Sequence, residues 1–143
     1  MELTSTAFNH NENIPSKYTC KGKDINPPLE IKEIPEGAKS LVLIVDDPDA
    51  PHKIWDHWIL FNINPHIQYI KEDMAPGVQG LNSWNKNKYG GPCPPSGTHR
   101  YFFKLYALDC KLELDETATK EDLIEEMQGH ILEQTELVGL FSK

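Results

Sequence analysis

Ser40-Leu41-Val42-Leu43-Ile44-Val45 is the stretch that decides the fold, and it ends abruptly at Asp46, Asp47 and Pro48. A short, continuous apolar run rich in β-branched residues is typical of a strand buried in the core of a sheet. The next run, Ile54 to Ile63 (IWDHWILFNI), follows after a connection of hairpin length. We expect the two strands to pair antiparallel, which would place Asp47 opposite His57 across the turn.

A third run, Tyr101 to Leu108 (YFFKLYAL), alternates strictly between two faces. One face carries Phe102, Lys104 and Tyr106, and the other carries His99, Tyr101, Phe103, Leu105 and Ala107. The same two-residue period groups His57 with Trp55, Ile59, Phe61 and Ile63. Both histidines and Tyr101 therefore share faces with apolar side chains, which predicts a partly buried polar pocket at one edge of a sheet.

The remaining elements are shorter. Thr119 and Asp122 resemble a capping box, and apolar residues then recur at helical spacing, which predicts one substantial helix over 120–134. Residues 74–98 are rich in glycine, proline and asparagine, and we expect this long loop to form the pocket wall. Further strands are predicted over 3–8, 30–34, 67–70 and 136–141. Many strands and one late helix indicate a mainly β fold, an antiparallel β-sandwich.

Composition restricts the partners and the compartment. The 143 residues suit a single domain, 1–143, and the net charge of −8 argues against nucleic acid and against an anionic membrane surface. The first residues lack a basic start and an apolar core, so we expect no signal peptide, and no run reaches membrane-spanning length. Cys20, Cys93 and Cys110 are an odd number without metal-ligand spacing, which favours reduced thiols and a cytoplasmic location.

Three motifs carry a resemblance. Asp47-Pro48-Asp49-Ala50-Pro51, the tryptophan-rich His57 strand ending in Asn62, and Gly-x-x-Pro-Pro-x-x-x-His-Arg-Tyr over 91–101 resemble the signatures of the phosphatidylethanolamine-binding protein family, which includes the Raf kinase inhibitor proteins. The chain is similar to the compact bacterial and archaeal branch. The resemblance implies a β-sandwich with Greek-key-like connections and a site for phosphate-like head groups. It places ligand-binding residues at Asp47, Asp49, Pro51, His57, Gly91, Pro95, His99 and Tyr101.

The chemistry of these residue types suits a small anion. Protonated imidazoles, the Tyr101 hydroxyl and backbone N–H groups near glycine can donate to a phosphate or carboxylate, and Asp47 can orient an imidazole by accepting from its other nitrogen. We therefore expect a non-enzymatic anion-binding protein without a cofactor. Arg100 should point to the opposite face and form a salt bridge, and Ala50-Pro51 is the best candidate for a cis peptide bond.

Other functions stay open at this point. The first alternative is an inhibitor of a kinase or hydrolase, in which the pocket holds an anionic residue of the partner. The second is an enzyme, either a hydrolase with Cys93 or Ser96 activated by His99 or a metal enzyme built on the Asp/His cluster. We expect neither a nucleophile nor a metal, because no specific motif surrounds them. Compared with larger family members, the chain lacks a C-terminal helical extension beside the pocket, and we expect a homodimer to cover the exposed surface.

Overall fold

The computed structural model describes all residues 1–143 and contains two sheets and one α-helix. The smaller sheet has the strand order β1-β3-β6, and the larger sheet has the order β2-β9-β8-β4-β5-β7. Neighbouring strands are antiparallel, except that β2 runs parallel to β9. The elements are β1 (Glu2–Thr4), β2 (Glu12–Asn13), the 3₁₀ turn η1 (Ser16–Tyr18), β3 (Leu29–Lys32), β4 (Ser40–Asp47), β5 (Trp55–Ile63), β6 (Tyr69–Ile70), β7 (Val78–Gln79), β8 (Thr98–Leu108), α1 (Lys120–Met127) and β9 (Ile131–Ser142).

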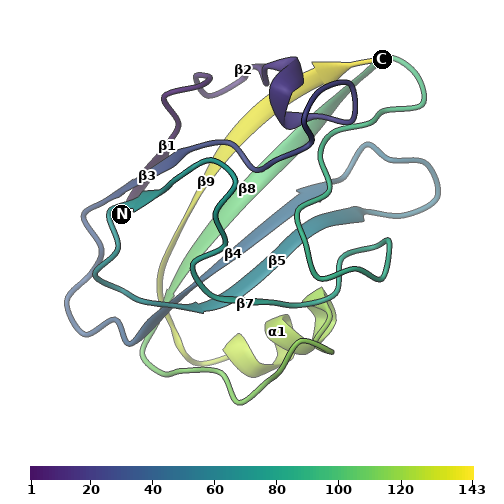
Figure 1. The fold of residues 1–143 in the computed structure, drawn as a ribbon. Coiled ribbons are helices and arrows are strands. Elements are labelled where there is room, and N and C mark those ends of the chain that lie inside the picture. Colours follow the sequence, from purple (N-terminus) through teal and green to yellow (C-terminus); the bar gives the residue numbers. More distant parts are fainter.

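The strand β4 lies in the middle of the larger sheet, as its continuous apolar run predicts. It pairs with β5 on one side and with β8 on the other, and all eight of its residues are buried. The small sheet covers one face of the larger sheet and α1 covers the other, as Figure 1 shows. The predicted mainly β sandwich with one helix near the C-terminus is confirmed.

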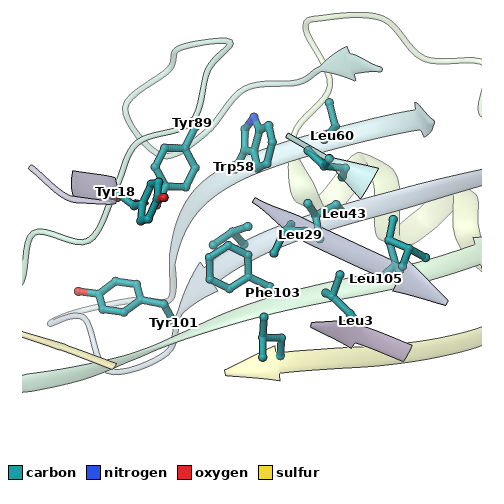
Figure 2. Close-up of a cluster of buried hydrophobic side chains, with 14 of the residues drawn as sticks. Leu3, Tyr18, Leu29, Leu43, Trp58, Leu60, Tyr89, Tyr101, Phe103 and Leu105 are labelled. Carbon is teal, nitrogen blue, oxygen red and sulfur yellow. Dashed lines mark hydrogen bonds between the residues drawn. The ribbon is translucent and has the colours of Figure 1, made fainter. Parts of the chain in front are cut away.

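Two apolar clusters lie on opposite faces of the larger sheet. The larger cluster, between the two sheets, includes Leu43, Trp58 and Phe103 together with Leu29 and Ile31 of the small sheet. Tyr101 lies at one end of this cluster, and its hydroxyl is directed away from Phe103 (Figure 2). The smaller cluster, under α1, contains Val42, Ile44, Ile59, Phe61, Leu108, Leu112, Ala118, Leu123 and Met127.

Two β-bulges in β5 overturn the predicted grouping of its side chains. Val45 is paired with Trp58 but Asp46 with Asp56, so His57 is an extra residue without a partner across the strand pair. A second irregularity lies near Asn62, whose φ is +53°. As a result Trp58 joins the cluster between the sheets, whereas Ile59 packs under α1. The two-residue period predicted that His57 and Ile59 share a face, and this was wrong because a bulge resets the alternation.

The helix is shorter than the predicted range 120–134. Its start is as expected: the Thr119 side chain accepts from the Asp122 amide, and the Asp122 carboxylate accepts from the Thr119 amide. It ends at Met127, and Gly129 follows with a φ of +80°, a conformation that stops helices. Residues 131–134 instead extend β9, which pairs with β8 along eleven register positions. A non-local strand pairing therefore outweighs the local helical spacing.

Two further predictions were wrong. Cys20 and Cys93 form a disulfide across 73 residues, so only Cys110 is a free thiol. The argument from three unpaired cysteines to a reducing compartment therefore loses its basis. The Ala50–Pro51 peptide bond is trans, and the chain contains no cis peptide bond. No helix in the chain has the length and apolarity needed to cross a membrane.

Candidate functional site

Asp47 and His99 form a buried pair at the end of the larger sheet. Asp47 is the last residue of β4, and His99 lies at the start of β8. The His99 Nδ1 and Asp47 Oδ2 atoms are 2.6 Å apart, and both side chains are buried. The Asp49 amide donates to the other Asp47 oxygen at 2.8 Å. Asp47 thus has partners for both oxygens, and it fixes His99 with Nδ1 toward the carboxylate and Nε2 left for another group.

His57 lies close to this pair but is not the residue opposite Asp47, although the sequence predicted that the two face one another; Asp47 is paired with Trp55 instead. Its Nδ1 is 2.6 Å from the Gly90 carbonyl oxygen, so Nδ1 carries a proton and donates it. Burial lowers the pKa of His57, and the Gly90 carbonyl and the Asp47 charge oppose this effect only in part. At neutral pH His57 is therefore uncharged, and its Nε2 is a hydrogen-bond acceptor rather than a donor.

Tyr101 lies beside both imidazoles. Its ring is 5.2 Å from the His57 ring, edge to face, and 6.5 Å from the His99 ring, nearly parallel. The hydroxyl is buried without a hydrogen-bond partner of good geometry. Burial and the Asp47 charge raise its pKa far above the ordinary value, although the nearby Cys93 amide opposes this, so the hydroxyl keeps its proton. An unpaired buried hydroxyl costs free energy that a ligand can recover.

Asp49 and Arg100 form an ion pair at the rim, as predicted for Arg100. The guanidinium donates from Nε and NH2 to the two Asp49 oxygens, both at 2.9 Å, and the Arg100 amide donates to Oδ2. The Arg100 guanidinium lowers the pKa of Asp49 despite partial desolvation. This bidentate pair ties the turn after β4 to β8. The Asp49 carboxylate is therefore occupied, although the resemblance had placed it among ligand contacts.

The remaining predicted residues form the walls. Gly91 is buried, and its amide donates to Asp24 Oδ1 at 2.7 Å, so this N–H is not available to an anion. A Cβ at Gly91 would come within 2.5 Å of Asp24 and the Tyr18 carbonyl oxygen, which explains the glycine. Pro51 and Pro95 are exposed, and no hydrogen bond joins either of them to His57, His99 or Tyr101.

Trp84 is the residue that sequence reasoning missed. Its ring lies 5.1 Å from the His57 ring and covers Gly90, where a Cβ would meet it at 2.4 Å. Next to it lies a pocket of about 360 Å³ that is also lined by Lys86, Lys88 and the Cys20–Cys93 disulfide. The loop over 74–98 had been predicted as the pocket wall, but nothing in the sequence indicated which of its side chains would reach His57.

The contacts of His99 and Cys93 bear on the catalytic alternatives. His99 has no hydroxyl or thiol bonded to it, and Cys93 is held in the disulfide, so neither proposed nucleophile is set up for attack. Asp47, His57 and His99 do not bring three metal-ligating atoms within 4.8 Å of one another. The arrangement instead offers a donor at Tyr101, an acceptor at the His57 Nε2 atom, and His99 Nε2 as donor or acceptor according to its protonation.

Comparison with known sequences gives consistent matches over the whole chain. A sequence model of the phosphatidylethanolamine-binding protein family matches residues 4–142. A UPF0098 protein of Methanothermobacter thermautotrophicus is 49% identical over 150 residues, covering 100% of this chain and 99% of the relative. A UPF0098 protein of Chlamydia trachomatis serovar D is 46% identical over 149 residues, again covering 100% of this chain and 99% of the relative.

Solved structures agree with these matches. The crystal structure of CT736 from Chlamydia trachomatis, described as a phosphatidylethanolamine-binding protein homologue, has a TM-score of 0.96 at 46% identity and covers 99% of this chain and 96% of its own. Escherichia coli YbcL, described as a member of the mammalian family, has a TM-score of 0.92 at 28% identity, covering 99% and 98%. The fold, the three motifs and these matches together show that the chain belongs to the phosphatidylethanolamine-binding protein family.

Proposed function

We propose that this protein is a non-enzymatic binding protein for a small phosphate-bearing anion. The observation that carries the proposal is the Tyr101 hydroxyl, which is protonated, buried and unpaired, on a ring that lies beside two imidazoles. A buried donor without a partner costs about 1–3 kcal/mol, which an acceptor oxygen of a ligand would restore. The family name, phosphatidylethanolamine-binding, supports a phosphate head group as the natural chemistry.

The protonation states refine the class of anion. Neutral His57 offers an acceptor at Nε2, whereas the Tyr101 hydroxyl offers a donor. A phosphate monoanion or a phosphomonoester that keeps one P–OH group presents both a donor and acceptors, and it matches this set. A fully deprotonated carboxylate presents acceptors alone and leaves the His57 Nε2 unpaired. The protein should therefore prefer a protonated phosphate to a carboxylate.

The adjoining pocket supports the same class of ligand. Lys86 and Lys88 line its 360 Å³ beside Trp84 and Gly90, which separate it from His57. The lining carries these two lysines and one carboxylate, Asp24, whose Oδ1 atom accepts from the Gly91 amide. In a chain of net charge −8, this excess of positive charge favours an anionic substituent there.

Titration with inorganic phosphate, followed through the imidazole resonances in NMR spectra, tests the proposal. We expect shifts of the His57 and His99 signals, with no response in His99→Ala. Tyr101→Phe should weaken binding by about tenfold or more, because it removes a hydrogen bond to a charged group. The same variant should be as stable as the parent or slightly more stable, since the lost hydroxyl has no partner. The exposed His66→Ala is the matched control and should bind as the parent does. An unchanged spectrum at millimolar phosphate would reject the anion site.

A further inference from the structure

A second cluster of ligating side chains lies at the opposite end of the long strands. Asp109 and Cys110 directly follow β8, and His130 directly precedes β9. The two strands are paired up to Leu108 and Ile131, so the register brings the three residues together although 20 residues separate Cys110 from His130 in sequence. This cluster takes no part in the phosphate site proposed above.

Backbone contacts hold the three positions. The Asp109 amide donates to the His130 carbonyl oxygen at 3.0 Å, and the His130 amide donates to the Met127 carbonyl oxygen at 3.0 Å. The Ser40 hydroxyl donates to the Cys110 carbonyl oxygen at 2.6 Å. The side chains thus project from a fixed frame, which limits the entropy that a ligand must remove on binding.

The side-chain atoms have the spacing of a metal site. One ligand atom from each residue lies within 4.8 Å of the other two, and the His130 Nδ1 and Asp109 Oδ1 atoms are 2.8 Å apart. Zinc ligands lie at about 2.0–2.3 Å from the ion, so neighbouring ligand atoms in a tetrahedral site are about 3.3–3.6 Å apart. His130 and Asp109 are about half exposed, so they can separate by the fraction of an ångström that an ion between them requires.

The ligand atoms and the charge of the cluster indicate which metal ion it would bind. A thiolate sulfur and an imidazole nitrogen favour zinc over magnesium or calcium, which prefer oxygen ligands alone. The Asp109 carboxylate, beside the His130 imidazole, adds a negative charge that favours a cation in the cluster. Three protein ligands leave the fourth position of a tetrahedron to water.

We propose that Asp109, Cys110 and His130 bind one zinc ion. The ion links the end of β8 to the start of β9 next to α1, and its binding stabilises the folded chain by mass action. No metal site was expected from the sequence, because the spacing of these residues matches no metal motif and the strand register alone assembles them.

Zinc titration of the full, metal-free chain by calorimetry, with metal analysis, tests the proposal. We expect one ion per chain and a raised melting temperature. Cys110→Ser and His130→Ala should each weaken binding by at least about tenfold, since even outer-shell changes at metal sites have effects of this size. His66→Ala should bind as the parent does. The melting temperature of each variant without metal shows whether it folds.

Two further measurements make the result decisive. Cobalt(II) in place of zinc should give a near-ultraviolet sulfur-to-metal charge-transfer band, absent in Cys110→Ser, because Cys110 is the free thiol. His99→Ala should lose the phosphate response and keep zinc binding, so failure at one site is distinguishable from failure at the other. Absence of saturable zinc binding, or zinc binding lost in His99→Ala and kept in His130→Ala, would overturn the proposal.

Discussion

Asp46 and Asp47 are neighbours in sequence, but they point to opposite faces of the larger sheet and have different partners. On the helix side, Asp46 accepts from Lys104 at 3.0 Å and Lys120 at 3.3 Å, and Lys120 also contacts Asp56 at 2.7 Å. Burial lowers the pKa of Lys120, but its ion pairs with Asp56 and Asp46 outweigh this and leave the pKa raised. The helix-side network thus pairs two positive with two negative groups, although one oxygen each of Asp46 and Asp56 has no hydrogen-bond partner of good geometry.

The site side is not balanced in this way. Asp47 orients His99, yet the Tyr101 hydroxyl is unpaired and the His57 ring is held by Nδ1 alone. Charges that neutralise one another across two elements hold a structure together, whereas an unpaired buried hydroxyl is a donor that a ligand oxygen can pair. We therefore propose that, within one strand, Asp46 serves the structure and Asp47 serves the anion site.

The largest expected effect is on the free energy of unfolding, and it comes from a substitution that disrupts the helix-side network. Asp46→Asn should lower the free energy of unfolding by about 3 kcal/mol, because it removes the shared partner of two lysines. We take the lower end of the range measured for buried ion pairs, because the Lys104 side chain is about a third exposed and solvent screens its interaction with Asp46. Phosphate binding should be unchanged. Urea unfolding and the phosphate titration measure both quantities.

Asp47→Asn is the matched change on the other face. It should abolish the phosphate response while lowering the free energy of unfolding by about 1.5–3 kcal/mol, the size of a hydrogen bond to a charged group. If both variants lost phosphate binding equally, the two faces would not be functionally separate.

A smaller effect is expected from pH, through His57. Its pKa in the folded protein is lowered by burial, so the unfolded chain takes up the proton first as pH falls. Stability from this group is complete above about pH 6.5, the unfolded value, and is lost as pH falls from there toward the folded value. The slope is at most about 1.4 kcal/mol per pH unit. Urea unfolding between pH 5 and 8 measures it, and His57→Asn should flatten the curve while the exposed His66→Asn should not. A slope that persists in His57→Asn would place the titration elsewhere.

The smallest energetic effect concerns assembly. We propose that the site face, where Trp84 is 41% exposed, forms a twofold homodimer. Trp84→Ser should then shift sedimentation toward the monomer while changing the free energy of unfolding of the chain by no more than about 0.5 kcal/mol. Glu125→Ala, on the exposed side of α1, should leave sedimentation unchanged. A parent protein that sediments as a single species near 16.3 kDa at every concentration would contradict the dimer.

The sequence by itself determined the central strands, the start of the helix at Thr119 and the family. Its alternation in β8 also placed His99 and Tyr101 on the core side, where both are buried. These features depend on apolar periodicity and capping, which act between residues a few positions apart.

The tertiary structure alone decided the partners. It paired Asp47 with His99 rather than His57, because the bulge in β5 leaves His57 without a partner across the strands and its Nδ1 atom donates to the Gly90 carbonyl oxygen. It ended the helix at Met127, joined Cys20 to Cys93, and assembled Asp109, Cys110 and His130. Each of these outcomes depends on strand register or loop closure between residues far apart in sequence, and local patterns carry no information about such contacts.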